Sequence, residues 1–230
     1  MTTASGDRLH PRVTEHSFIQ LRSLAAAVRE EARQAPAGIV LDLGCGGRPY
    51  AELFSGRYVG LDVAVFHGEP DLLGVAERVP IRDGSIDIVL STQHLEHADD
   101  PGTVLDEARR VLAPGGLLLL STHGVWVHHP DPHDYWRWTE EGLRRLMEAH
   151  GFAVERVHRQ GELFTASLLL ASYPFAGIQR SKRPMARRAA GTMIAAFNGL
   201  ALALDAMAGR VLPRHYASAG YLVAAKRRVD

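Results

Sequence analysis

The side chains most able to do chemistry gather between His123 and Thr139. This stretch holds all three tryptophans and four of the twelve histidines of the 230-residue chain. Histidine is the usual general base near neutral pH, and a hydroxyl that attacks an electrophile must give up its proton. We therefore expect His133 to be a catalytic base that Asp134 or another acid orients, with His123 as the second candidate.

Two other interpretations of this segment remain open. In the first, the histidines and aromatic rings only line a pocket, and the protein acts by positioning its substrates. In the second, imidazoles and one carboxylate bind a transition-metal ion, and the donors are His128, His129, His133 and Asp134. Adjacent histidines do not easily converge on one ion, so we expect no metal here.

A second chemical feature is a glycine turn that follows the first apolar run. Residues 39–43 are apolar and rich in β-branched side chains, which is typical of a buried parallel strand. Gly44 and Gly46 then let the backbone bend sharply and a ligand approach closely. A turn of this kind after the first strand binds nucleotides in doubly wound α/β folds.

Two residues around this turn indicate the kind of nucleotide. A dinucleotide-binding loop has a third glycine, and this chain has Pro49 there. Asp42 precedes the loop, and its carboxylate would repel a pyrophosphate and attract an ammonium group. These residues favour S-adenosylmethionine (SAM), which has an amino acid end and no phosphate, over a nicotinamide dinucleotide.

Asp62 ends the next predicted strand, residues 57–62. It follows the first loop by about 20 residues, where such folds place a carboxylate that accepts the ribose hydroxyls. We expect Asp62 to bind the ribose.

The composition excludes several classes of protein. Lys plus Arg equals Asp plus Glu at 26 each, so no overall basic field favours nucleic acid as the partner. The single cysteine, Cys45, rules out an internal disulfide framework and suits a reducing compartment. The N-terminal residues lack the apolar core of a secretion signal. We therefore expect a cytoplasmic protein.

Hydrophobic periodicity predicts the elements that position these residues. The predicted helices are 18–34, 50–54, 103–112 and 140–150, and the predicted strands are 39–43, 57–62, 72–76, 86–91, 117–121, 152–158 and 220–226. Residues 1–12 are expected to be loosely attached. Residues 1–36 are expected to form a helical flap over the ligand, or else to pack on the edge of the sheet.

Residues 161–214 form a late insertion between the sixth and seventh predicted strands. Two apolar stretches flank a basic turn around residues 180–188. Neither is a clean membrane span, because the first is too short and the second contains Asn198 and Asp205. We expect two helices that form a lid or a homodimer surface. Peripheral contact with an anionic membrane and contact of the basic turn with RNA stay open as alternatives.

Five segments in this order resemble the class I SAM-dependent methyltransferases, most closely their UbiE/methyltransferase-11-type branch. The segments are VLDLGCG at 40–46, GLD at 60–62, DGSIDIV at 83–89, LEH at 95–97 and RVLAPGG at 110–116. The resemblance covers residues 39–152, about half of the chain. It implies a single Rossmann-like α/β domain over 1–230, a doubly wound seven-stranded sheet with the last strand antiparallel.

The same resemblance implies a function. The expected enzyme moves the SAM methyl group to a small-molecule acceptor, with a hydroxyl as the first choice. The alternatives are N- or C-methylation of a lipophilic metabolite, or a module that binds SAM without catalysis.

The resemblance also implies roles for individual residues. Gly44 and Gly46 would pass close to the methionine part of SAM, with Asp42 near its ammonium group. Asp62 would hold the ribose, and Val63 would lie against the adenine.

Further implied contacts lie on the far side of the adenine and after the fourth strand. Ala76 and Glu77 would border the other adenine edge. The family often has an aspartate where this chain has Val75, so we expect its contact with the adenine amino group to be lost or made by the backbone. Three residues would border the methionine and the methyl group: Ser91, Gln93 and His94.

Overall fold

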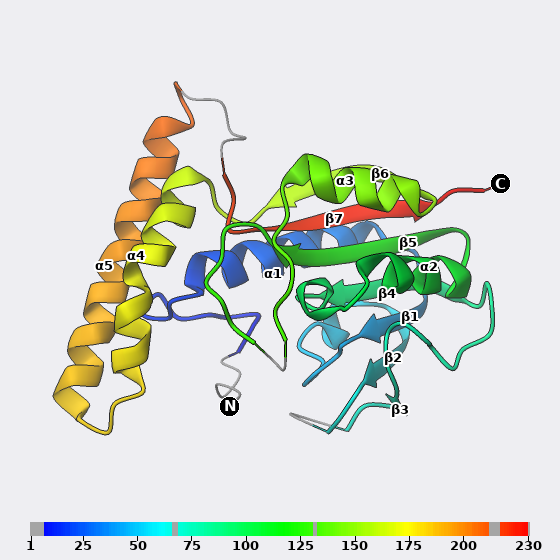
Figure 1. The fold of residues 1–230 in the computed structure, drawn as a ribbon, viewed down its shortest axis with the longest axis horizontal. Helices are drawn as coiled ribbons and strands as arrows, with labels where there is room; N and C mark the ends of the chain where they lie inside the picture. Colours follow the sequence, from blue (N-terminus) through cyan, green and yellow to red (C-terminus); the bar gives the residue numbers. More distant parts are fainter. Residues whose placement is uncertain (1–6, 66–68, 131–132, 212–216, 230) are drawn as a thin grey trace.

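The computed structural model describes residues 7–65, 69–130, 133–211 and 217–229, and a seven-stranded sheet forms its core (Figure 1). The strand order is β3-β2-β1-β4-β5-β7-β6. β7 runs antiparallel to β5 and β6, and the other neighbouring strands pair in parallel. This confirms the predicted Rossmann-like sheet with an antiparallel last strand. The strands are β1 (Gly38–Leu43), β2 (Gly56–Asp62), β3 (Leu72–Leu73), β4 (Ile86–Thr92), β5 (Leu112–His123), β6 (Phe152–Arg159) and β7 (Gly220–Arg227).

The helices begin close to where the sequence predicts them. The α-helices are α1 (Phe18–Gln34), α2 (Pro101–Val111), α3 (Glu140–Ala149), α4 (Leu163–Gln179) and α5 (Pro184–Ala208), and the 3-10 helices are η1 (Ala51–Leu53) and η2 (Leu95–His97). Side chains cap two of them. Asp100 accepts from the Gly102 amide at 2.9 Å before α2, and Thr139 accepts from the Gly142 amide at 3.1 Å before α3.

Two strands differ in length from the prediction. β3 ends at Leu73, because Val75 turns back to form an isolated bridge with Arg78. β5 starts at Leu112, well before the predicted residue 117. The predicted turn at residues 114–116 is instead an irregularity within the pairing of β4 with β5.

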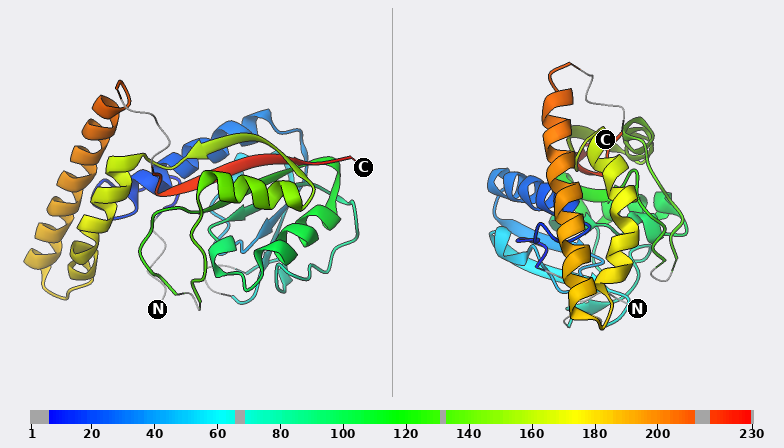
Figure 2. Two further views of the ribbon diagram at one scale, coloured as in Figure 1. Left: turned by 45° about the horizontal axis from the view of Figure 1, so that its top comes forward. Right: turned by 90° about the vertical axis from the view of Figure 1, so that its left-hand side faces the viewer.

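Alternate side chains of the central strands pack on opposite faces of the sheet. Leu41 of β1 lies in a core with Leu105 of α2 and Met147 of α3. Val40, its neighbour in the strand, lies in a separate core with Leu24 of α1. Figures 1 and 2 show α2 and α3 on one face and α1 on the other. These two buried layers hold the carboxyl ends of β1, β4 and β5 in place.

Helix α1 is fixed to β6 by a buried acid. Glu31 is fully buried and accepts from Arg156 at 2.6 and 2.8 Å and from His158 at 2.7 Å. The hydrogen bond from Arg156 is the main reason why the pKa of Glu31 is lowered, against the opposing effect of burial. Helix α1 therefore packs on the sheet. The described residues before α1 contact two other parts of the protein, the candidate active site and helix α5.

Helices α4 and α5 form the hairpin predicted for residues 161–214, beside the body of the domain (Figures 1 and 2). Asp205 of α5 accepts from the Phe164 amide at 2.8 Å and from Thr165 Oγ1 at 2.7 Å at the start of α4. Asn198 donates to the carbonyl oxygens of Val13 and Glu15 at 2.8 and 3.0 Å. Asp205 therefore holds the hairpin together, and Asn198 fixes it to the N-terminal segment.

Among the described residues, α5 is the one helix long and apolar enough to cross a membrane by length and composition, and 28% of its most apolar window is buried.

Candidate active site

The glycine turn after β1 has the conformation that its sequence predicts. Gly44 and Gly46 have φ angles of +72° and +49°, which only glycine adopts freely. A Cβ at Gly44 would lie 2.9 Å from the ring of His94, whereas a Cβ at Gly46 would meet no atom within 4 Å. The Gly46 amide donates to Asp62 Oδ2 at 2.8 Å. The turn therefore joins the ends of β1, β2 and β4, and its Gly46 side is open to a ligand.

Asp42 is a buried carboxylate with one oxygen still free for a ligand. It is 1% exposed, and Oδ2 accepts from the Tyr58 hydroxyl at 2.6 Å. Oδ1 is buried and has no hydrogen-bond partner among the described residues. Burial raises the pKa of Asp42 to about 7, against the opposing effect of the Tyr58 hydrogen bond. An ammonium group at Oδ1 would stabilise the ionised carboxylate.

Three polar groups at the end of β4 also lack partners in the described structure. They are Ser91 Oγ, Gln93 Nε2 and His94 Nδ1. Gln93 has a φ angle of +54°, which is uncommon for a residue with a side chain. Burial lowers the pKa of His94, so its ring is neutral near pH 7. Unpaired buried polar atoms around a glycine turn fit the amino acid end of SAM, which offers both donors and acceptors.

Arg8 lies beside the candidate site, although no sequence motif pointed to it. Its Nη1 donates to Gln93 Oε1 at 3.4 Å, and its charge opposes the burial-driven rise in the pKa of Asp42 and of Tyr50. The prediction that residues 1–12 are loosely attached is therefore wrong for Arg8, and residues 1–6 lie outside the described residues. Arg8 therefore places a cation beside Gln93 and Asp42, which are both expected to border the methionine part of SAM.

The residues expected around the ribose and adenine lie together at the ends of β2 and β3. Asp62 accepts from the Gly46 and Val63 amides, each at 2.8 Å. The Val63 side chain is 58% exposed, as an apolar surface open to a flat ring would be. Ala76 is buried and Glu77 is half-buried in the turn after β3. The ribose and adenine contacts themselves remain predictions.

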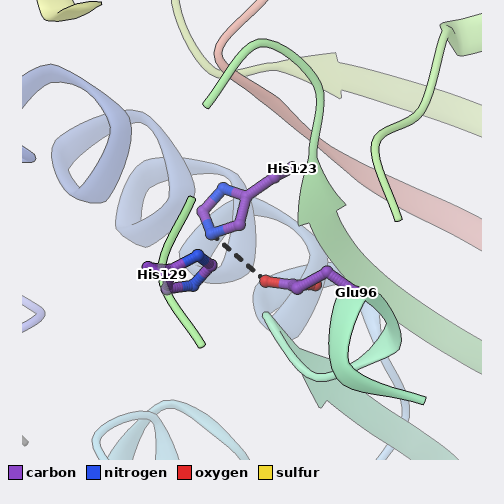
Figure 3. A group of neighbouring side chains, drawn as sticks. All are labelled: Glu96, His123 and His129. Atoms are coloured by element: carbon purple, nitrogen blue, oxygen red, sulfur yellow. Dashed lines mark ion pairs between the residues drawn. The ribbon is translucent and has the colours of Figure 1, made fainter. Parts of the chain in front are cut away.

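A second cluster lies at the ends of β4 and β5, and Figure 3 shows its three side chains converging from separate elements. Glu96 comes from η2, His123 ends β5 and His129 lies in the segment that follows β5. Their ligand atoms all lie within 4.8 Å of one another. Glu96 and His123 are 0% and 2% exposed. Burial raises the pKa of Glu96 and lowers that of His123 well below its usual value.

Residues further along the same segment do not form the predicted catalytic pair. Asp134 accepts from Nη1 and Nη2 of Arg137, each at 2.6 Å, and from the His129 amide at 2.9 Å. Burial alone would raise the pKa of Asp134, but the Arg137 hydrogen bonds hold it below its usual value. His133 is exposed, its ring stacks on Tyr135, and no hydrogen bond from this ring to Asp134 is present in the described structure. The expectation that Asp134 orients His133 is therefore corrected.

The structure gives His123 a different acid. His123 Nε2 lies 3.1 Å from Glu96 Oε1, and the His123 ring stacks on Trp126 with centroids 4.4 Å apart. The sequence groups His129 with His128, His133 and Asp134 as possible metal donors. In the structure, His129 instead lies with Glu96 and His123. In the sequence, Glu96 stands out only as part of the LEH segment of the family resemblance. Its proximity to His123 follows from the position of β5 beside β4.

The fold and the glycine turn define an α/β protein of the Rossmann-like class with a site for a nucleoside-bearing cofactor. A family model described as Methyltransferase domain (Methyltransf_11) matches residues 41–120. A Yersinia pestis malonyl-[acyl-carrier protein] O-methyltransferase is 32% identical over 123 residues, which are 48% of this chain and 42% of that protein. A probable SAM-dependent methyltransferase of Mycolicibacterium smegmatis is 28% identical over 169 residues, 66% of this chain and 65% of that protein.

Solved structures agree on the fold. The SAM complex of phosphoethanolamine N-methyltransferase 2 from Haemonchus contortus superposes with a TM-score of 0.57 and 18% identity, over 90% of this chain and 52% of that chain. Residues 41–120 thus carry a SAM-dependent methyltransferase domain, and SAM is the cofactor of this domain. The matches span less than two thirds of the length of the two curated relatives.

Proposed function

We propose that this protein transfers the methyl group of SAM to a hydroxyl of a small-molecule acceptor. The observation that supports this choice is the Glu96–His123–His129 cluster beyond His94, on the expected methyl side of the cofactor. A hydroxyl must lose its proton for methylation, and imidazole and carboxylate groups are suited to receive it. The O-methyltransferase relative from Yersinia pestis is consistent with an oxygen acceptor.

The proposed reaction is an in-line displacement at the methyl carbon. The acceptor oxygen forms the new bond to that carbon, the carbon–sulfur bond breaks, and its electron pair stays on sulfur to give S-adenosylhomocysteine (SAH). The proton leaves through the cluster to the solvent that reaches His129, whose side chain is 33% exposed. The main task of the protein is to hold the oxygen and the methyl group in line.

A labelled-methyl assay tests this function. We would incubate the protein with deuterated-methyl SAM and panels of hydroxyl, amine and carbon-acid metabolites, and detect labelled products by mass spectrometry. Glu96→Gln is expected to lower turnover by at least about 100-fold while leaving SAH affinity unchanged. Products labelled only on nitrogen or carbon would contradict the hydroxyl assignment. SAH binding without any labelled product would favour a non-catalytic SAM-binding module.

The α4–α5 hairpin supports a second part of the proposal, peripheral contact with an anionic membrane that supplies a lipophilic acceptor. Five cationic side chains gather at the turn of the hairpin: Arg180, Lys182, Arg183, Arg187 and Arg188. Large apolar side chains are exposed beside them, including Ile178 at 43% and Met185 at 85%. The whole chain has no net charge, so this concentration of cations is local. Basic and apolar groups together match an anionic lipid surface.

Vesicle sedimentation tests the membrane contact. The protein is expected to bind phosphatidylglycerol-containing vesicles but not pure phosphatidylcholine vesicles. The double variant Arg183→Glu, Arg187→Glu should bind at least about tenfold more weakly. Its matched control, Arg82→Glu with Arg145→Glu, makes the same change in charge away from the hairpin. Equal losses in both variants, or a homodimer in light scattering without vesicle binding, would contradict this part.

A further inference from the structure

The cluster of Glu96, His123 and His129 has the donor types and the spacing of a metal site. We propose that it binds one divalent transition-metal ion and that Zn²⁺ is the ion it prefers. Two imidazoles and one carboxylate are donors that zinc accepts. One ligand atom from each of the three residues lies within 4.8 Å of the others.

The geometry of the first two ligands favours an ion over a direct hydrogen bond. His123 Nε2 and Glu96 Oε1 are 3.1 Å apart, yet Oε1 has no hydrogen-bond partner in the described structure. The ring nitrogen and the oxygen are thus close together without the alignment that an N–H···O bond needs. Ligand bonds of about 2.0–2.1 Å around a tetrahedral zinc ion place neighbouring ligand atoms about 3.3 Å apart. The observed separation is close to that value.

Neighbouring groups hold these side chains as an outer shell holds metal ligands. Thr122 Oγ1 donates to Glu96 Oε2 at 2.8 Å, which leaves Oε1 for the ion. Asp134 Oδ2 accepts from the His129 amide at 2.9 Å and so fixes the backbone of this ligand, while His129 Nδ1 has no hydrogen-bond partner in the described structure. Trp126 stacks on the His123 ring. A hydrogen-bonded carboxylate such as Glu96 is a common feature of the ligands in known metal sites.

The burial of Glu96 is a second reason to expect a cation at this cluster. Glu96 is fully buried, and an unpaired carboxylate oxygen in such a position costs free energy that a bound cation would offset. Arg137 is the nearby guanidinium, but both of its terminal nitrogens already donate to Asp134. Glu96 Oε1 therefore remains available.

Three protein ligands leave a four-coordinate zinc ion one open position. If the proposed O-methylation holds, the acceptor hydroxyl would bind there, the ion would lower the pKa of that hydroxyl, and its proton would pass directly to solvent, because the ion would occupy the ligand atoms of the cluster. Metal binding itself does not depend on the proposed function.

Metal titration tests the site directly. The protein would be stripped with a chelator and titrated with Co²⁺, followed by visible absorption, and then with Zn²⁺, followed by calorimetry. We expect one ion per chain and a Co²⁺ spectrum of low coordination number. His129→Ala and Glu96→Gln should weaken Zn²⁺ binding by more than about 100-fold. The matched control is His128→Ala, because His128 is the adjacent histidine, is 73% exposed and lies outside the cluster.

The SAH affinity of each variant shows whether it is folded. Wild-type protein that binds no Co²⁺, or Co²⁺ spectra unchanged in His129→Ala and Glu96→Gln, would overturn the metal site. Metal binding lost in His128→Ala as much as in His129→Ala would also overturn it. Methyl transfer that persists without any metal would leave the proposed function intact, and metal binding without methyl transfer would leave only the metal site.

Discussion

The Tyr58 hydroxyl donates a 2.6 Å hydrogen bond to Asp42 Oδ2, across the neighbouring strands β1 and β2. This bond fixes a buried carboxylate at the mouth of the glycine turn and leaves Oδ1 unpaired. The sequence shows the acid, but only the strand register shows that a phenol holds it.

Asp42→Asn is expected to separate stability from cofactor binding. Burial raises the folded-state pKa of Asp42 from its ordinary 3.8 to about 7, so its protonated form is favoured in the folded protein. This contribution to stability is present at low pH and is lost as the pH rises to about 7. At pH 8 the free energy of unfolding of the asparagine variant, measured by urea denaturation, should be about 2–4 kcal/mol higher than that of wild type. Lower stability would contradict the assignment.

Cofactor binding should change in the opposite direction in the same variant. Loss of the carboxylate should weaken SAH binding by about 10- to 100-fold, because a charge-assisted contact is removed. In wild type, SAH affinity should rise with pH up to about 7 and then level off, since the ligand ammonium binds ionised Asp42. Calorimetry in buffers of different ionisation enthalpy should detect the released proton below pH 7. A flat affinity profile would argue against an ammonium at Asp42.

Arg8→Ala tests whether the N-terminal segment takes part in the site. We expect SAH affinity to fall about 10- to 100-fold, because Arg8 would pair with the methionine carboxylate. Affinity for 5′-methylthioadenosine, which lacks the amino acid end, should stay the same. Arg12→Ala is the control, because the Arg12 side chain is 80% exposed and pairs with Glu15. Equal losses for both ligands would place Arg8 in a purely structural role.

Asp62→Ala should weaken SAH binding by at least about tenfold, since its carboxylate is expected to accept the ribose hydroxyls. The same carboxylate holds the Gly46 amide, so the loss has a structural part. The 2′,3′-dideoxy analogue of SAH measures that part, because it has no hydroxyls to bind. A loss as large for the analogue as for SAH would show that Asp62 does not bind the ribose.

His133→Ala is expected to change turnover by less than about threefold. Its ring is exposed and stacks on Tyr135, while its carbonyl oxygen, which the variant retains, accepts from His97 Nδ1 at 2.5 Å. Turnover with saturating SAM should therefore fall far less than in Glu96→Gln. A loss of 100-fold with unchanged SAH affinity would restore His133 as the base.

Glu31→Gln is expected to lower the free energy of unfolding by about 1–3 kcal/mol at pH 7, because Arg156 and His158 lose their charged partner. The pKa of Glu31 is lowered in the folded protein, so its contribution is present above the ordinary value of 4.5 and is lost as the pH falls through the lowered value. Urea denaturation checks both points. Glu30→Gln is the control on the exposed side of α1, and an equal change there would contradict the role of Glu31.

The sequence by itself determined the features that depend on short stretches of chain. The apolar run before Gly44 and Gly46 indicates both a buried strand and a turn that needs positive φ angles, because these follow from local side-chain types. Asp42 and Asp62 could be chosen from their spacing to that turn.

The tertiary structure decided which distant residues meet. Glu96, His123 and His129 come together only because β5 lies beside β4 and the segment after β5 folds back toward η2. Arg8 reaches the site through the path of the N-terminal segment, and Asp134 meets Arg137 instead of the His133 ring. No local pattern carries this information, because each pairing depends on the packing of elements far apart in the chain.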